Sequence, residues 1–159
     1  MRKIKMSLVV IVLLTVTISC DKHPITIKPV LIAEGDIFAG DAGNFVIKTQ
    51  AEWDNLICYR SQFYGDSVVC RHSIDINFDM FQIIAVIDGI RPKGGWSINI
   101  TSIREYSDDI IVSIYIKGGG VTDELTQPYQ IVKIPVTAKD VVFKYINFIP
   151  PLDLGEDIL

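Results

Sequence analysis

Alternation of apolar and polar side chains in the second half of the chain restricts the fold more than any other feature. Apolar residues occupy every second position in the segments 74–78, 96–100 and 112–116. A period of two is typical of a strand with one buried face. Residues 83–87 are apolar without a break, which predicts a central strand covered on both faces. Together with the one helix described below, this pattern predicts a mainly β fold (α+β), arranged as a small antiparallel β-sheet or sandwich domain.

Further strands are expected on both sides of this region, at residues 32–38, 44–48, 129–134 and 141–146. The first two of these surround the turn-rich residues 40–43 and predict a hairpin. Residues 106–109 predict a turn between the alternating strands that flank them, which gives a meander. Pro135 suits a strand end, where no hydrogen bond of the ladder is lost.

One helix is predicted over residues 50–62. Thr49 and Glu52 have the spacing of a capping box, in which each side chain bonds the backbone N–H of the other residue. Apolar residues from Trp53 onward then follow at helical spacing,. A tryptophan at the head of an amphipathic helix is usually packed, so we predict that Trp53 anchors the core. A role in stacking on a surface ligand is the alternative.

The N-terminus has the three-part layout of an export signal. Three cations precede a 13-residue apolar run at residues 6–18, and the small Ser19 directly precedes Cys20. The run is shorter than the roughly 20 apolar residues that a bilayer-spanning helix needs. We therefore predict a signal peptide at residues 1–19.

The residues TISC at positions 17–20 resemble the lipobox of bacterial lipoproteins, whose cysteine accepts lipid and becomes the new N-terminus. Thr17 stands where that family usually has Leu. The resemblance implies that Cys20 is the lipidation site and that the chain is anchored to a membrane of the bacterial cell envelope, facing the periplasm or the cell surface. Two or more acyl chains suffice for stable attachment. The alternative is an ordinary secretory signal that leaves Cys20 unmodified.

The remaining length supports one domain. We expect the lipidated cysteine and a tether at residues 20–31, a single domain at 32–149 and an acidic tail at 150–159. The chain has 15 Lys and Arg against 19 Asp and Glu. Three of the cations lie in the predicted signal peptide, so 12 against 19 remain and the mature chain carries a net charge of −7. An acidic surface argues against binding of nucleic acid.

Two further cysteines, Cys58 and Cys70, form an even pair in an exported chain, which predicts a disulfide. The bond would close a loop of 13 residues and stabilise the fold by about 3 kcal/mol in the chain-entropy model. The alternative is two buried free thiols.

Candidate catalytic and metal-binding groups are few. Of the two histidines, His23 lies in the predicted tether and His72 lies beside Cys70 in a predicted loop. This set lacks the four ligands of a zinc site. The acidic pairs at 108–109 and 123–124 lie among turn residues, where we expect them to be solvated. We therefore predict no catalytic, cofactor or metal site, and no enzyme activity.

The most distinctive stretch, residues 88–96, joins the continuously apolar strand to the next one. Adjacent glycines allow positive φ, and a proline stiffens the entry. A rigid loop with basic and aromatic groups on an acidic domain predicts a partner-binding site, made of Arg91, Pro92, Lys93, Gly94, Gly95 and Trp96,. The alternative is a demanding turn without a binding role, with Trp96 facing the core.

Two blocks of the sequence resemble a known family. The residues GIRPKGGWSINI at 89–100 are similar to the G-x-R/K-P-T-G-G-Y-x-I-x-I signature of the PrcB C-terminal domain family. The residues TQPYQIVKIP at 126–135 resemble its second block, T-x-P-Y-x-I-V-x-I-P. The similarity covers about residues 80–145, with Lys93 in place of Thr and Trp96 in place of Tyr. It implies a small β-domain, often found on bacterial lipoproteins, whose namesake belongs to a cell-surface protease complex. It supplies no catalytic residues.

These observations lead to one expected function and one rival. We expect a membrane-anchored, non-enzymatic module that binds another envelope protein through residues 91–96, with residues 118–126 as a second candidate segment. The family resemblance implies a role as an accessory of a surface protease complex. The rival is a protease inhibitor that inserts the 91–96 loop into an active-site cleft. It rests on a looser similarity between residues 92–96 and the N-P-T-T-G-Y/F loop of chagasin-type inhibitors of cysteine proteases.

Overall fold

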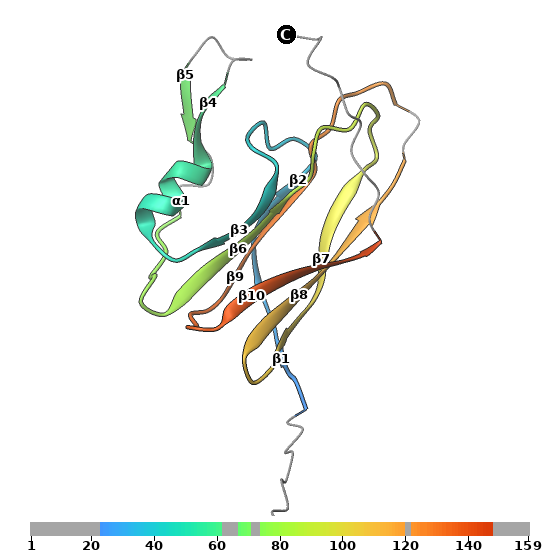
Figure 1. Ribbon diagram of the computed structural model, residues 1–159. Coiled ribbons are helices and arrows are strands. Elements are labelled where there is room, and N and C mark those ends of the chain that lie inside the picture. Colours follow the sequence, from blue (N-terminus) through green and yellow to red (C-terminus); the bar gives the residue numbers. More distant parts are fainter. Residues whose placement is uncertain (1–22, 62–66, 71–73, 120–121, 148–159) are drawn as a thin grey trace, which may run out of the picture.

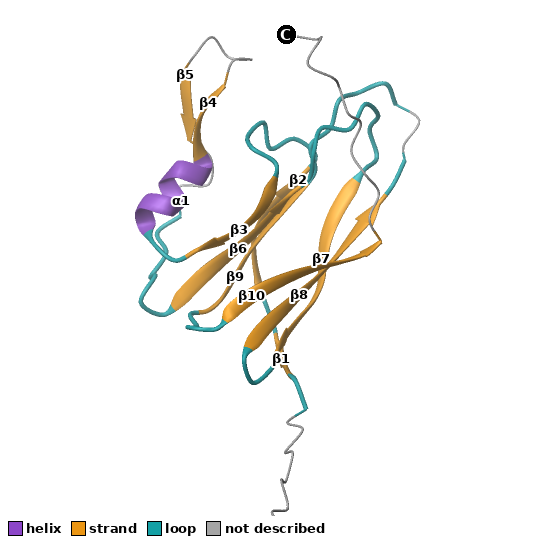
Figure 2. Cartoon of the chain, viewed as in Figure 1, coloured by secondary structure: helices purple, strands orange, loops and turns teal. Residues whose placement is uncertain are grey.

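The computed structural model describes residues 23–61, 67–70, 74–119 and 122–147. In these residues two four-stranded sheets pack as a β-sandwich, and a short helix lies on the outer face of one sheet (Figures 1 and 2). The predicted mainly β fold with one helix is therefore confirmed. The predicted signal peptide, Cys20 and the acidic tail lie outside the described residues.

The first sheet has the strand order β1, β7, β8, β10. Its strands are β1 (Ile25–Ile27), β7 (Ser97–Glu105), β8 (Asp109–Lys117) and β10 (Asp140–Asn147). The predicted meander is confirmed, since the turn from β7 to β8 closes with Tyr106 N donating to Asp109 O at 2.8 Å. β10 is parallel to β8 and not antiparallel, because the chain enters β10 from the other sheet.

The second sheet has the strand order β2, β9, β6, β3, with every neighbouring pair antiparallel. Its strands are β2 (Val30–Gly35), β9 (Tyr129–Pro135), β6 (Phe81–Ile87) and β3 (Gly43–Ile47). Pro135 ends β9, as predicted.

Successive residues of β6 belong to two different cores. Ile84 and Val86 face the first sheet, whereas Ile83, Ala85 and Ile87 face the helix. All five are at most 1% exposed. The continuous apolar run is thus a central strand covered on both faces, as predicted, because the second sheet is the middle layer of the molecule.

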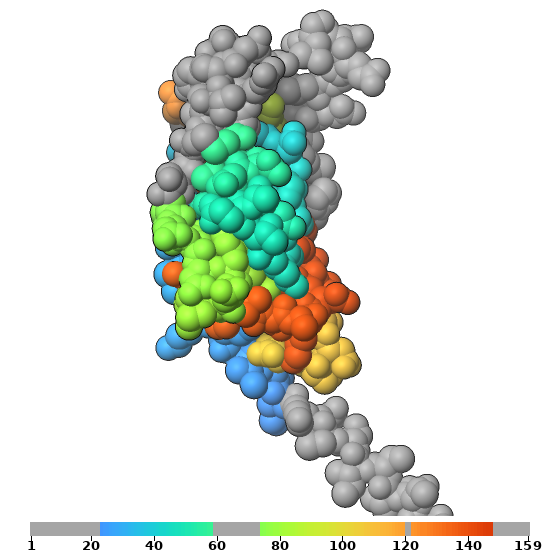
Figure 3. All heavy atoms as spheres, turned by 90° about the vertical axis from the view of Figure 1, so that its left-hand side faces the viewer, coloured from blue at the N-terminus to red at the C-terminus, as the bar shows by residue number. Residues whose placement is uncertain are grey.

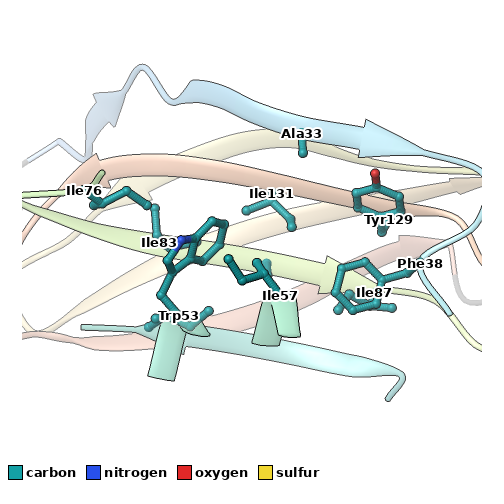
Figure 4. Close-up of a cluster of buried hydrophobic side chains, with 11 residues drawn as sticks. Ala33, Phe38, Trp53, Ile57, Ile76, Ile83, Ile87, Tyr129 and Ile131 are labelled. Carbon is teal, nitrogen blue, oxygen red and sulfur yellow. The ribbon is translucent and has the colours of Figure 1, made fainter. Parts of the chain in front are cut away.

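The helix, α1 (Gln50–Ile57), begins at the predicted capping box. Thr49 Oγ1 accepts from Glu52 N at 3.2 Å, and Glu52 Oε2 accepts from Thr49 N at 3.1 Å. Trp53 is fully buried and points from α1 into the cluster that contains Ile83 and Ile131 (Figure 4). The prediction of Trp53 as a core anchor is confirmed.

The predicted end of the helix at residue 62 is wrong. α1 ends at Ile57, and the next residues form β4 (Cys58–Ser61), which pairs with β5 (Ser67–Cys70). Helical spacing continues in the sequence beyond Ile57, but pairing with a strand that follows along the chain gives these residues a different backbone. Such a tertiary contact overrides a short periodic signal.

The predicted hairpin of residues 32–38 with 44–48 is also wrong. β2 and β3 form the two edges of the second sheet, with β9 and β6 between them. An alternating pattern fixes which face of a strand is buried, but it does not select the neighbouring strand. Residues 36–42 therefore cross the end of the sheet and do not form a tight turn.

Residues 74–78 do not form the predicted strand. Their alternation is nevertheless reflected in burial, since Ile76 is 6% exposed and Ile74 is 45% exposed. Ile76 packs in the core beneath α1. The alternating pattern of residues 74–78 therefore reflects contact with that core, and it does not indicate pairing with another strand.

Two strands begin within the range predicted as a tether, residues 20–31. β1 and β2 begin at Ile25 and Val30, and the chain passes from the first sheet to the second at Pro29. A short polar segment with prolines suits a crossing between sheets as well as it suits a linker, because proline fits where no ladder bond is needed.

The two ends of the sandwich differ in their connections. The start of β1 lies at one end, whereas residues 36–42, 88–96 and 122–128 lie together at the opposite end (Figure 1). In the described part of the chain, no helix has the length and apolar character that crossing a bilayer requires.

Candidate functional site

Three loops meet at the end of the sandwich opposite β1, and we call residues 36–42, 88–96 and 122–128 the loop platform. Gln127 joins two of them. Its backbone N–H donates to Asp36 O at 2.6 Å, and its carbonyl accepts from Phe38 N at 3.1 Å. Its side-chain amide accepts from Gly40 N at 3.2 Å and donates to Gly40 O at 2.7 Å. This buried residue therefore fixes the first loop to the third.

The second and third loops are joined as closely. Arg91 and Thr126 exchange two backbone hydrogen bonds, of 2.7 and 2.9 Å. The Thr126 hydroxyl donates to Lys93 O at 3.0 Å, and Gly94 N donates to Thr122 O at 2.9 Å. A Cβ atom at Gly94 would overlap Thr122 Oγ1. This short ladder holds the backbone of all three loops in one arrangement.

Arg91 is buried, which corrects the prediction that it is an exposed recognition residue. It is 1% exposed and forms a bidentate ion pair with Asp88, of 2.8 Å from Nε to Oδ2 and 3.0 Å from Nη2 to Oδ1. Its guanidinium lies 4.5 Å from the centroid of the Trp96 ring. Asp88 Oδ1 also accepts from Gly89 N at 2.8 Å. The acid three residues before Arg91 was the signal that sequence reasoning missed.

The other five predicted site residues divide between surface and interior. Pro92, Lys93 and Gly95 are exposed, Gly94 is buried, and Trp96 is half-buried against the core between the sheets. Gly95 has a φ of 79°, a left-handed conformation that favours glycine. The exposed part of the predicted loop is therefore Pro92, Lys93 and Gly95, whereas Arg91 is buried beneath them and Trp96 packs partly against the core.

Three large apolar side chains of the loop platform are exposed, one on each loop. Ile37 is 54% exposed, Ile90 is 40% exposed and Leu125 is 59% exposed. Because the bridged residues Arg91 and Thr126 are both buried, their neighbours Ile90 and Leu125 face the opposite way, toward solvent. Sequence reasoning did not identify these three residues, since nothing in a pattern separates an exposed isoleucine in a loop from a buried one.

The platform loops also carry exposed charges. Asp36 precedes Ile37 in the sequence, Asp123 and Glu124 precede Leu125, and all three acids are exposed, as is Lys93 of the predicted loop. Among the described residues, no group of three His, Cys, Asp or Glu side chains could hold a metal ion. The platform thus offers apolar and charged contact surface on a fixed backbone.

The two remaining cysteines of the predicted disulfide lie opposite each other in the backbone. Cys58 and Cys70 are direct partners in the register of β4 and β5. Residues directly opposite in an antiparallel pair have Cα atoms about 4.5–5.5 Å apart, which lies in the range that a disulfide requires. The register is compatible with the predicted bond, which stays a prediction. His72, the nearest histidine in sequence, lies outside the described residues.

The fold explains the spacing of the two sequence blocks noted above. The first block contains Arg91 and the second contains Thr126, and these two residues pair in the loop platform. Each block then runs into a strand, β7 or β9. The two blocks are therefore in contact and form one structural unit.

Comparison with known proteins agrees with this grouping. No curated protein and no solved structure matches the chain. The family model described as PrcB C-terminal matches residues 82–135, from the start of the central strand to the end of β9. This match confirms that the blocks at residues 89–100 and 126–135 resemble the PrcB C-terminal family.

Proposed function

We propose that this protein is a non-enzymatic binding module, held by lipid at Cys20 on a membrane of the bacterial cell envelope, that binds another envelope protein through the loop platform. The observation that carries the proposal is the set of three exposed apolar side chains, Ile37, Ile90 and Leu125, on loops whose backbones are fixed to one another. Apolar anchors on a preorganised surface supply binding energy with little loss of conformational entropy.

The position of the platform suits a membrane-anchored binder. Ile25 lies five positions after Cys20, so the lipidated residue can lie at most about 18 Å from the start of β1. β7 has nine residues and spans about 30 Å from end to end of the sandwich. A lipid at Cys20 would therefore hold the β1 end near the bilayer and present the platform away from it.

The resemblance to a family whose namesake belongs to a surface protease complex suggests the class of partner, a protein of such a complex. We favour this accessory role over a protease inhibitor. An inhibitory loop must enter a cleft, whereas residues 91–94 are bonded along their length to residues 122–126. A loop bonded to its neighbour in this way suits contact with a protein surface better than entry into a cleft.

The test is affinity capture from detergent-solubilised envelopes with two matched double variants. Ile90→Asp with Leu125→Asp places charges on the platform, and Val142→Asp with Ile146→Asp makes the same change on exposed residues of β10. We expect the platform variant to lose the partner and the β10 variant to keep it, with both retaining the thermal stability expected of exposed substitutions. Equal capture by both variants would contradict the proposal.

A further inference from the structure

A groove of about 450 Å³ lies between β3 and α1, beside the loop platform. One wall is a continuous run of β3, residues 44–47, and the other consists of Glu52, Asn55 and Leu56 of α1. Asp41 of the first platform loop also lines the groove. Figure 3 views the molecule from this side, with α1 beside the segment that contains β3.

The β3 wall is the edge of a sheet. All five residues of β3 pair with β6 on one side, and no described strand pairs with the other side. Alternate N–H and C=O groups of an edge strand point away from the sheet and can pair with an added chain. The groove therefore places hydrogen-bonding groups of the backbone along a surface that an extended chain can reach.

The chemistry of the walls indicates what kind of chain fits. Phe45 and Leu56 are half-buried apolar side chains, and Asp41 and Glu52 are exposed acids. Hydrogen bonding from the Lys48 backbone N–H is the largest effect that lowers the pKa of Glu52, so this carboxylate stays charged at neutral pH. The Lys48 ammonium donates to Thr137 O at 3.1 Å, and no cation lies among the lining residues.

Asn44 is held in place on the groove wall. The Tyr145 hydroxyl of β10 donates to Asn44 Oδ1 at 3.1 Å. Burial raises the pKa of Tyr145, against a smaller opposite effect of this hydrogen bond, so the hydroxyl keeps its proton and the contact persists at neutral pH. This contact restrains the side chain of a residue that lines the groove.

We infer that this groove binds an extended peptide segment with alternating basic and apolar side chains, which adds as a strand to the free edge of β3. Backbone hydrogen bonds to β3 supply sequence-independent affinity, as in other cases of strand addition. The apolar side chains of the segment contact Phe45 and Leu56, and its basic side chains face Asp41 and Glu52. At about 3.3 Å per residue, the groove takes a segment of roughly four residues. The groove includes Phe38, Gly40 and Asp41 of the first platform loop but neither Ile90 nor Leu125, and its occupation does not depend on the proposed partner.

The test uses a fluorescein-labelled peptide, Lys-Val-Lys-Phe-Lys-Val, and fluorescence anisotropy at about 150 mM salt, where charges beyond roughly 8 Å are screened. Two related peptides serve as probes of mechanism. Glu-Val-Glu-Phe-Glu-Val reverses the charge, and a version of the basic peptide with alternate amides N-methylated cannot complete the ladder. We expect saturable binding of the basic peptide and no binding of the acidic peptide. The N-methylated peptide should bind at least about tenfold more weakly, because it loses more than one hydrogen bond to β3.

Protein variants locate the site. Asp41→Lys should weaken binding by about fivefold, since an attraction between exposed charges becomes a repulsion. Asn55→Trp should block the groove without changing its charge. Asp140→Lys, the same charge change on an exposed residue at the start of β10, should leave binding unchanged. Equal loss in Asp41→Lys and Asp140→Lys, or equal binding of the N-methylated peptide, would overturn the inference. Either result leaves the test of the loop platform unaffected, because that test uses other residues.

Discussion

Replacing Arg91 by Met should destabilise the protein by about 3 kcal/mol. Removing one partner of a buried ion pair typically costs about 3–5 kcal/mol, because the other charge stays buried without its partner. Asp88 is 7% exposed and keeps one hydrogen bond, from Gly89 N at 2.8 Å, so we expect the lower end of that range. The lost contact of the guanidinium with Trp96 at 4.5 Å adds about 1 kcal/mol or less. Lys93→Ala, an exposed cation of the same loop, should change stability by no more than about 0.5 kcal/mol.

Urea unfolding followed by tryptophan fluorescence measures this difference, since Trp53 is buried and Trp96 lies beside Arg91. A loss of about 3 kcal/mol lowers the midpoint by roughly 1–3 M. The double variant Asp88→Asn with Arg91→Met removes both charges and should be less destabilised than the sum of the two single variants by more than about 1 kcal/mol. A cost for Arg91→Met as small as that for Lys93→Ala, or additive costs in the double variant, would refute the ion pair as a buried structural element.

Four further predictions concern other parts of the chain. Cys20→Ser should move the protein from the detergent phase to the aqueous phase on phase partition, and unchanged partition would exclude Cys20 as the lipid site. Cys58 and Cys70 should yield a mass two hydrogens below that of the reduced chain, and reduction should cost about 3 kcal/mol of stability in the chain-entropy model; two alkylatable thiols in the native protein would contradict this. Thr49→Ala should cost about 1 kcal/mol through loss of the helix cap. The pKa of Glu52 is lower in the folded state than its usual value of 4.5. The contribution of its carboxylate to the free energy of unfolding is therefore present above pH 4.5 and declines as the pH falls through the folded pKa. The difference in unfolding free energy between wild type and Glu52→Gln should accordingly shrink from pH 7 to pH 3.

The strands with strong periodic signals could be predicted from sequence because the polarity of successive residues follows their burial. β6, β7, β8 and β9 all lie where the pattern put them, and the capping box gave the start of α1. Weak signals near element ends failed. The helix stopped at Ile57, where pairing with β5 begins to compete, and the segment at 74–78 packs on the core without a partner strand.

The candidate site could be predicted only in part. Residues 88–96 do lie at a surface formed with the second segment that the sequence singled out. The pairing of Arg91 with Thr126, 35 positions further along the chain, explains why the two blocks occur together. The three exposed apolar residues were missed. Ile37 and Ile83 are the same residue type, and their exposure differs, at 54% and 0%, because of what surrounds each one.

By itself, the sequence determined which faces of the strands are buried, where the helix begins and which family blocks are present, because these depend on residues that are neighbours along the chain. The tertiary structure alone decided that β9 and β6 separate β2 from β3, that Arg91 turns inward to Asp88, and that Ile37, Ile90 and Leu125 gather at one end of the sandwich. These outcomes depend on contacts between segments far apart in the chain. A local pattern specifies which face of a strand is apolar, but the free energy gained by burying that face depends on which distant segment covers it.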